Sequence, residues 1–192
     1  TRILFLANPN NPTGTGLPFT EIKRLRESLR EDILLVLDAA YAEYCHADEY
    51  RDGSSLVNNA AANVVVLHTF SKIYGLAALR VGWAYAPLEI VEVLNNLRGV
   101  FTVSTAAQLC AVAALHDEAH LQKSRTHNNA ARASLSAQLA ALGFNVLPSA
   151  TNFVCVQFTD SAAAAAADLL LRQNGLIPRT LNEYDMPDCL RI

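Results

Sequence analysis

The chain has 192 residues, of which 52% are hydrophobic and 17% charged, and its formal net charge is −3. These proportions are typical of a globular chain with a sizeable core and exclude general disorder. The acidic balance leaves no basic surplus for a phosphate backbone, so we expect no nucleic-acid partner. No apolar run approaches the roughly 20 residues of a membrane helix, and the first residues lack the layout of a signal peptide. We therefore expect a cytoplasmic protein with no membrane partner.

Short β-branched runs alternate with longer helical patterns along the first half of the chain, which is typical of an α/β fold. The first helix is predicted to be capped by Thr20, and a second to open at Pro87 and run through Leu97. This alternation predicts a mostly parallel sheet with crossover helices. Its strands are predicted at Ile3–Ala7, Ile33–Leu37, Val64–His68 and Val81–Ala86.

The second half is first almost wholly helical and then mixed. Residues 105–142 have a helical pattern with a break near His116 and Asp117, and Gly143 is a stop signal. Ser161 is predicted to cap a helix through the alanine run 162–167. We therefore predict the larger domain over residues 1–116, and a linking helix with a small α+β domain over residues 117–192. Strands of the small domain are predicted at Phe144–Leu147, Asn152–Phe158 and Leu176–Pro178.

The segment ANPNNPTGTG, residues 7–16, follows the first predicted strand. Its glycines do not form a dinucleotide loop, because Phe19 stands where the third glycine is needed, and no GK[ST] follows. The two Asn-Pro steps instead favour extended backbone at Asn8 and Asn11, with the amide of Asn11 pointing away from the sheet. Taken alone, the segment is better explained as a plain turn.

Two further segments place polar groups after apolar strands. LLVLDAAYAEY, residues 34–44, ends its strand at Asp38 and places Tyr41 three residues later. A carboxylate at the carboxyl end of a parallel strand lies where open α/β sheets bind ligands. HTFSKIYGLAALR, residues 68–80, sets Lys72 among hydroxyl residues and Arg80 eight positions further on. Alone, these residues are better explained as a helix cap, a core tyrosine and a loop lysine.

Together, strand ends at residues 7, 38 and 68 bring an amide, a carboxylate, a phenol and an amine to one crevice. This set suits pyridoxal 5'-phosphate. Its pyridine nitrogen needs a carboxylate to stay protonated, and its aldehyde needs a lysine. Its ring oxygen needs hydrogen-bond donors, and its phosphate needs hydroxyls and an arginine. The sequence therefore predicts pyridoxal phosphate as the cofactor.

The segments NPNNPTG, D-x-x-Y and TFSK with its following arginine resemble the fold-type I aminotransferases, most closely their histidinol-phosphate branch, along nearly the whole chain. The resemblance implies that Lys72 carries the cofactor as a Schiff base and that Asp38 partners the pyridine nitrogen. It implies that Asn11 and Tyr41 donate to the ring oxygen. The phosphate ligands that it implies are Thr69, Ser71 and Arg80.

The closing segment matches the small domain of the same family. After TNFV at residues 151–154 comes the final LRI, in which Arg191 resembles the arginine that holds the substrate carboxylate. Arg179, in LIPRT, resembles a second substrate contact, to the phosphate, in the histidinol-phosphate branch. The substrate-binding residues implied are therefore Asn11, Arg179 and Arg191, and no metal site is predicted.

The function implied by this resemblance is amino transfer from histidinol phosphate to 2-oxoglutarate, giving imidazole acetol phosphate and glutamate, in histidine biosynthesis. The partners are then a small-molecule amino donor and a 2-oxo acid, and the full-length protein is expected to be a homodimer. Three alternatives use the same cofactor residues: an aromatic amino-acid aminotransferase, a threonine-phosphate decarboxylase and a non-catalytic domain that binds pyridoxal phosphate.

Two further features bear on these expectations. Family members are longer by roughly a domain, and their N-terminal part contains a helix whose first N–H groups hold the cofactor phosphate. We therefore expect this chain to be a piece of a longer protein that lacks part of its own site. Glu43 and His46 suggest acid/base chemistry only weakly, because no nucleophile lies near them in the sequence.

Overall fold

The computed structural model describes residues 1–45, 50–57 and 63–192. The chain divides into two compact units. Unit 1 comprises residues 1–9 and 17–126, and unit 2 comprises residues 10–16 and 127–192. Within the described residues, no helix combines the length and the apolar character that crossing a membrane requires. The domain boundary expected after residue 116 stays a prediction.

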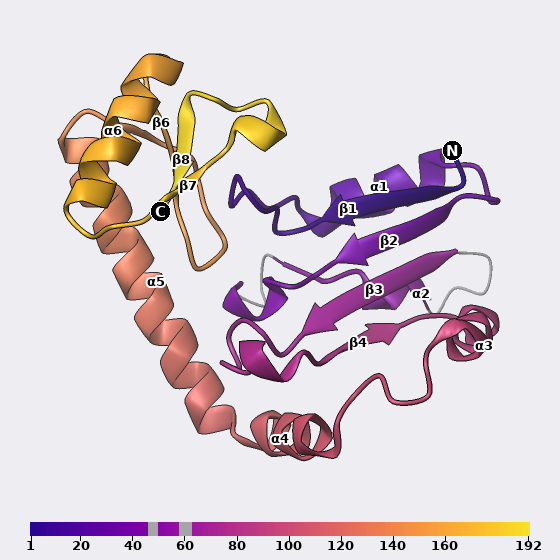
Figure 1. Cartoon of the computed structure of the whole chain (residues 1–192). Coiled ribbons are helices and arrows are strands. Elements are labelled where there is room, and N and C mark those ends of the chain that lie inside the picture. The colour runs from indigo at the N-terminus through magenta and orange to yellow at the C-terminus, as the bar shows by residue number, and fades with distance from the viewer. Residues whose placement is uncertain (46–49, 58–62) are drawn as a thin grey trace. The chain divides into compact units, whose positions relative to one another are not determined.

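Unit 1 is built on a four-stranded sheet in the order β1-β2-β3-β4 (Figure 1). β1, β2 and β3 are parallel, and β4 is antiparallel to β3. In this register Ala7 lies opposite Asp38, and Asp38 lies opposite Leu67, so the carboxyl ends of three strands lie side by side. The predicted α/β fold with a mostly parallel sheet is confirmed. The strands are β1 (Ile3–Ala7), β2 (Leu34–Asp38), β3 (Val64–Thr69) and β4 (Gly82–Tyr85).

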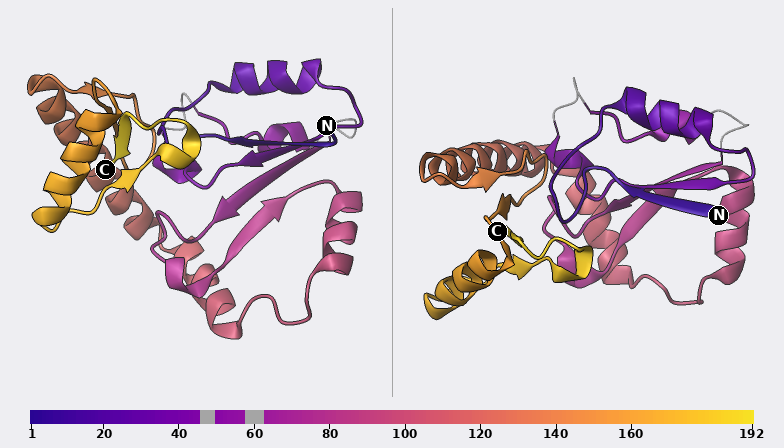
Figure 2. Two further views of the ribbon diagram at one scale, coloured as in Figure 1. Left: turned by 45° about the horizontal axis from the view of Figure 1, so that its top comes forward. Right: turned by 90° about the horizontal axis from the view of Figure 1, so that it is seen from above.

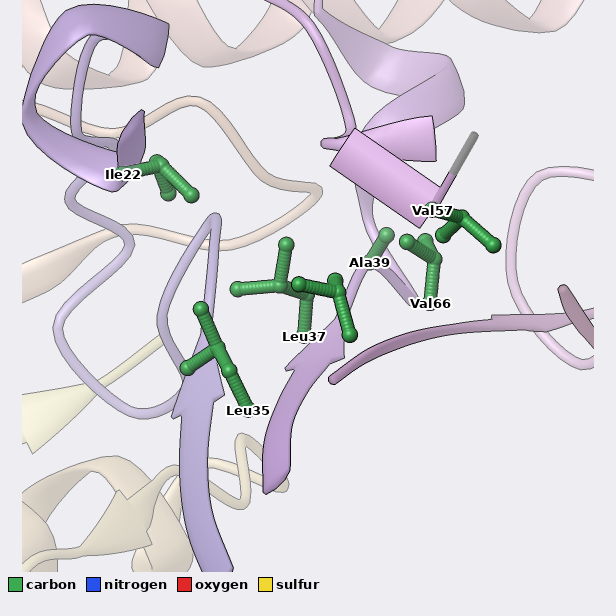
Figure 3. Packing of buried hydrophobic residues seen from close by; sticks show 7 residues of the cluster. Ile22, Leu35, Leu37, Ala39, Val57 and Val66 are labelled. Carbon is green, nitrogen blue, oxygen red and sulfur yellow. The ribbon is translucent and has the colours of Figure 1, made fainter. Parts of the chain in front are cut away.

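Two helices cover one face of this sheet, α1 (Phe19–Ser28) and the short α2 (Ser54–Val57) (Figure 2). Alternate strand residues point toward them, and each fully buried aliphatic side chain contributes roughly 1.5–3 kcal/mol relative to exposure. On the other face of β1, Ile3 and Phe5 are exposed. Figure 3 shows the buried cluster, which comprises Ile22, Leu35, Leu37, Ala39, Val57, Val64 and Val66.

The end of α1 depends on a buried arginine. Arg26 is only 8% exposed, and its guanidinium donates to the backbone oxygens of Leu29, Arg30 and Ile33. These carbonyls belong to Leu29, the C-cap of α1, and to residues that follow it. The buried guanidinium thus has acceptors for its N–H groups, and these carbonyls have a donor. This arrangement fixes the turn that leads from α1 into β2.

Three helices follow β4, and their limits agree with the sequence prediction. α3 (Leu88–Leu97) has Pro87 as its N-cap, and α4 (Thr105–His116) is capped by Ser104, whose hydroxyl accepts from the backbone nitrogen of Ala107. Asp117 separates α4 from α5 (Glu118–Ala141), which confirms the predicted break. Gly143 follows α5 with φ of 88°, as expected of a glycine that ends a helix.

Unit 2 contains a second four-stranded sheet, in the order β5-β6-β8-β7, and all its pairings are antiparallel. α6 (Ser161–Gln173) connects β6 to the segment before β7. These elements confirm the predicted small α+β region. Its strands are β5 (Asn145–Val146), β6 (Cys155–Gln157), β7 (Arg179–Thr180) and β8 (Cys189–Arg191).

Three local predictions were wrong. The N-cap of α1 is Pro18, two residues before Thr20; the proline ring holds φ at −66°, and the helix begins directly after it. The cap of α6 is Asp160 rather than Ser161, since the Asp160 carboxylate accepts from the backbone nitrogen of Ala163 at 2.8 Å. No strand forms at residues 176–178; β7 begins at Arg179 instead, because Pro178 has no N–H to give to the ladder.

Candidate functional site

A turn at the carboxyl end of β2 carries the first predicted site residues. Asp38 is the last residue of β2, and its Oδ1 accepts from the backbone nitrogen of Ala40 at 3.0 Å. This bond closes an Asx turn. The turn directs the chain into the 3-10 helix η1 (Ala42–Tyr44), of which Tyr41 is the N-cap. Asp38 is exposed and Tyr41 is buried, so the carboxylate faces outward beside an anchored phenol ring.

Lys72 lies in the turn that follows β3. Phe70 and Ile73 are buried on either side of it, so the intervening Ser71 and Lys72 are held at the surface of the sheet edge. The ammonium nitrogen of Lys72 lies 5.1 Å from the centroid of the Tyr41 ring. A cation at this distance from an aromatic face is attracted to it. The structure thus places the predicted lysine and the predicted tyrosine together.

A short chain of hydrogen bonds joins the predicted phosphate ligands. The hydroxyl of Thr69 accepts from the backbone nitrogen of Ser71 at 3.1 Å, and Nη1 of Arg80 donates to the hydroxyl of Ser71 at 3.2 Å. The same Nη1 donates to the backbone oxygen of Ala77, in the 3-10 helix η2 (Ala77–Leu79). Two hydroxyls and a guanidinium grouped in this way are typical ligands of an anion such as phosphate.

Unit 2 contains the other predicted residues. Nη1 of Arg191 donates to Oδ1 of Asn11, which fixes the Asn11 amide and leaves its NH₂ group to another acceptor. The Arg191 guanidinium also lies 5.0 Å from the centroid of the Phe153 ring. The loop that holds Asn11 requires Gly14, because its φ is 81° and an added Cβ would lie 2.6 Å from Oγ of Ser149.

Arg179 forms a surface ion pair. Its Nη2 lies 2.6 Å from Oε2 of Glu183, in the 3-10 helix η3 (Asn182–Tyr184), and both side chains are exposed. Exposed pairs of this kind contribute roughly 0–1 kcal/mol. An anionic ligand can therefore displace Glu183 at little cost.

Sequence reasoning missed a buried polar group next to the sheet edge. Nδ1 of His68 lies 3.0 Å from Oε1 of Glu43, and its Nε2 lies 2.9 Å from Oδ2 of Asp52. The imidazole is stacked on the ring of Trp83, with centroids 4.2 Å apart. One sign in the sequence pointed to it: His68 follows Val64 and Val66 at the next position of β3 that faces the core. Glu43 pairs with His68, and His46, which was considered as its partner, lies outside the described residues.

The two carboxylates strongly perturb this histidine. Burial alone would lower the pKa of His68, but its hydrogen bonds with Asp52 and Glu43 outweigh burial and raise the pKa to about 9. The hydrogen bond from His68 lowers the pKa of Asp52 to about 2, against the opposing effect of burial. His68 is therefore an imidazolium at neutral pH.

Asn8 was predicted only as an extended residue before proline, and the structure gives it a second role. It is 4% exposed, and its side-chain amide both accepts from the backbone nitrogen of Leu17 and donates to the backbone oxygen of Leu17. Its own backbone oxygen accepts from the hydroxyl of Tyr50. Asn8 thereby joins the end of β1 to the residue that precedes α1 by two positions.

The predicted residues thus fall into two groups. One group lies along the carboxyl edge of the unit 1 sheet, and the other, in unit 2, contains Asn11, Arg179 and Arg191. The roles that the sequence assigns to all of them stay predictions. The residues of the first group are Asp38, Tyr41, Thr69, Ser71, Lys72 and Arg80.

Comparison with known proteins establishes the family. The model of the family described as "Aminotransferase class I and II" matches residues 1–192, and the chain belongs to this family. Histidinol-phosphate aminotransferase of Granulibacter bethesdensis is 53% identical over 192 residues, which are all of this chain and 52% of that protein. Histidinol-phosphate aminotransferase of Rhodopseudomonas palustris strain BisB5 is 50% identical, over all of this chain and 53% of its own length.

A solved structure shows the same fold. Histidinol-phosphate aminotransferase from Sinorhizobium meliloti, in complex with pyridoxal-5'-phosphate, aligns with a TM-score of 0.90 at 33% identity. The alignment covers all of this chain and 52% of that one. The chain therefore spans about half the length of the relatives that it matches.

The backbone of Arg80 gives a test of local strain at the site. Its φ of 52° is left-handed, which costs a non-glycine residue about 1 kcal/mol or more. We predict that Arg80→Gly is more stable than Arg80→Ala by about 1 kcal/mol, because both lose the side-chain bonds and only glycine relieves the strain. Urea unfolding followed by the fluorescence of Trp83 measures this difference.

Arg98 provides the matched control, because its φ is −69°. There the glycine variant should be no more stable than the alanine variant. Equal stability of the two Arg80 variants would contradict the account of strain at the site.

Proposed function

We propose that the full-length protein is a pyridoxal-phosphate-dependent aminotransferase that acts on histidinol phosphate and 2-oxoglutarate. The observation that carries this proposal is that the Lys72 ammonium lies 5.1 Å from the Tyr41 ring centroid. In the same turn, Ser71, the residue before Lys72, is joined by hydrogen bonds to Thr69 and Arg80. Membership of the aminotransferase family supports it, as do two relatives at 50% identity or more that are named histidinol-phosphate aminotransferase.

The residues present fit this cofactor chemically. The cofactor has an aldehyde, a ring nitrogen that must keep a proton, a ring oxygen and a phosphate. An amine, an exposed carboxylate, a phenol and a grouped set of anion ligands lie along one sheet edge in unit 1. The carboxyl edge of parallel strands is also where open α/β sheets bind ligands.

When bound, pyridoxal phosphate supplies an electron sink for the charge that develops at the substrate α-carbon. Asp38 would hold the proton at the ring nitrogen on which this sink depends. Lys72 would anchor the cofactor covalently and, once displaced by the substrate amine, would move the proton that leaves the α-carbon. Thr69, Ser71 and Arg80 would hold the phosphate.

The remaining residues would orient the ring and select the substrate. Tyr41 and the NH₂ group of Asn11 would donate to the ring oxygen, and Arg191 would bind the carboxylate of glutamate with its planar fork. Arg179 would exchange Glu183 for the phosphate of histidinol phosphate. We also propose that the full-length protein acts as a cytoplasmic homodimer, which is typical of the family.

The direct test uses the full-length protein that contains these 192 residues. We expect it to form glutamate from 2-oxoglutarate with histidinol phosphate as donor, at a higher kcat/KM than with phenylalanine. Asp38→Asn preserves the turn, because the asparagine oxygen still accepts from Ala40, but it removes the charge that holds the ring proton. We expect it to retain cofactor and to lower kcat by about 10³-fold or more, which corresponds to a few kcal/mol.

Asp32→Asn is the matched control, because Asp32 pairs with Arg2 and Arg30 at the surface, and its kcat should be unchanged. Near-normal kcat in Asp38→Asn would show that another carboxylate holds the ring nitrogen. Preferred turnover of phenylalanine, release of carbon dioxide, or cofactor binding without turnover would each replace the proposed activity with one of the three alternatives.

Arg191 provides a separate test of substrate recognition. Arg191→Lys keeps a positive charge but loses the fork that reaches a carboxylate with two parallel bonds. We expect KM for glutamate to rise roughly 10- to 100-fold, as the loss of one charge-assisted hydrogen bond predicts. Arg172→Lys, whose arginine pairs with Asp168 on the exposed side of α6, is the control. An unchanged KM in Arg191→Lys would place the carboxylate elsewhere.

A further inference from the structure

His68 occupies an unusual position for a polar residue. It follows Val64 and Val66 on the face of β3 that packs against the core, and its side chain is only 6% exposed. Its ring is stacked on Trp83, which lies directly opposite it on β4. An ionisable group at such a position requires compensating partners. The partners come from two segments that are distant in the sequence.

The geometry of these contacts requires a protonated ring. Both ring nitrogens lie within hydrogen-bond distance of a carboxylate oxygen, from Glu43 on one side and Asp52 on the other. A neutral imidazole has one N–H and one lone pair, so it could donate to only one of the two carboxylates. The imidazolium donates to both.

The two carboxylates do not depend on His68 equally. Asp52 also accepts from the backbone nitrogen and the hydroxyl of Ser54, at 2.9 and 2.8 Å. Among the described residues, His68 is the one hydrogen-bond donor to the Glu43 carboxylate, whose other oxygen is buried without a partner. Arg125 donates to the backbone oxygen of Glu43 rather than to its carboxylate. When His68 loses its proton, its contact with Glu43 is therefore weakened more than its contact with Asp52.

This contact connects the two segments that carry the cofactor residues. Glu43 belongs to η1, two residues after Tyr41, and His68 precedes Lys72 by four residues. We propose that His68 is a positioning residue of the cofactor site: its imidazolium ties η1 to the end of β3, and so holds Tyr41 against Lys72. This role rests on the proposed function, and it adds a residue to the site that touches neither cofactor nor substrate.

The surroundings of His68 set the pH at which its contact with Glu43 is lost. The pKa of His68 is about 9, above the ordinary 6.5. The His68 contacts with the two carboxylates therefore contribute fully to the stability of the fold below about pH 6.5, and this contribution is lost as pH rises through about 9. Trp83 is the facing residue of β4 and does not titrate. His68 also lines a pocket, in which the other charged or titratable side chains are Glu43, Cys45, Tyr50, Arg51, Asp52 and Arg125.

The test compares three full-length proteins: wild type, His68→Gln and His68→Arg. Glutamine cannot donate in both directions, whereas arginine can donate to both carboxylates at every accessible pH. At pH 7 we expect His68→Gln to bind pyridoxal phosphate about tenfold more weakly than wild type, and His68→Arg to restore the affinity. Between pH 7 and 10 the affinity of wild type should fall relative to that of His68→Arg.

A second readout does not involve the cofactor. An imidazolium stacked on an indole quenches its fluorescence, and Trp83 is the single tryptophan of these 192 residues. The fluorescence of the wild type without cofactor should rise in a transition centred near pH 9, and neither variant should show it. If His68→Gln does not fold, wild type and His68→Arg are compared between pH 7 and 10, and the difference in their cofactor affinity and fluorescence tests the proposal.

The possible failures can be told apart. Equal affinity of wild type and His68→Gln at pH 7, or parallel pH profiles of wild type and His68→Arg, would overturn the positioning role. The absence of pyridoxal phosphate binding in all three proteins would overturn the proposed function instead. In that case the fluorescence transition would still show whether His68 holds its proton against Trp83.

Discussion

The parallel register of β1, β2 and β3 is the constraint on which the rest of unit 1 depends. Because Ala7, Asp38 and Leu67 are aligned across these three strands, the segments that follow β1, β2 and β3 all leave the sheet at one edge. That edge receives the turn with Asp38 and Tyr41 and the turn with Lys72. The buried row of Leu35, Leu37, Val64 and Val66 keeps the register, since a shift by one residue would turn these side chains to the opposite face. Hydrophobic burial thus positions the turns that carry Asp38, Tyr41 and Lys72.

At this edge, polar side chains form hydrogen bonds with backbone groups and with one another. The Asp38 carboxylate binds the backbone nitrogen of Ala40 with one oxygen, and the Thr69 hydroxyl does the same for Ser71. These short-range bonds shape the turns. Long-range bonds then hold the turns in place, and the pair of Glu43 and His68 is the clearest, because it joins residues 25 positions apart. Rigid support by a second layer of residues is what precise placement of reactive groups requires.

Sequence reasoning located the strands of unit 1 where the local pattern decides them, and the roles that it gave to the site residues stay predictions. The short runs Ile3–Ala7 and Val64–His68 identified β1 and β3. D-x-x-Y and TFSK each supplied one residue of the pair Tyr41 and Lys72, which the fold brings together. Sequence reasoning failed where a residue far away in the sequence decides the local structure. The register with β8 and the missing N–H of Pro178 moved β7 beyond the predicted strand. Asn11 and Arg191 are 180 positions apart, so only the resemblance to a family related them. The partners of His68 likewise come from other segments, and its inward position was the only local sign.

The central claim is that Lys72 carries the cofactor. The most direct measurement is to add pyridoxal phosphate to the full-length protein, fix it on its lysine with borohydride, and locate the modified residue by proteolysis and mass spectrometry. The 192 residues contain three lysines, Lys23, Lys72 and Lys123, and Lys23 is paired with Glu27 on the exposed side of α1. The account predicts stoichiometric modification of Lys72 alone. Modification of any other lysine, or none at all, would contradict it.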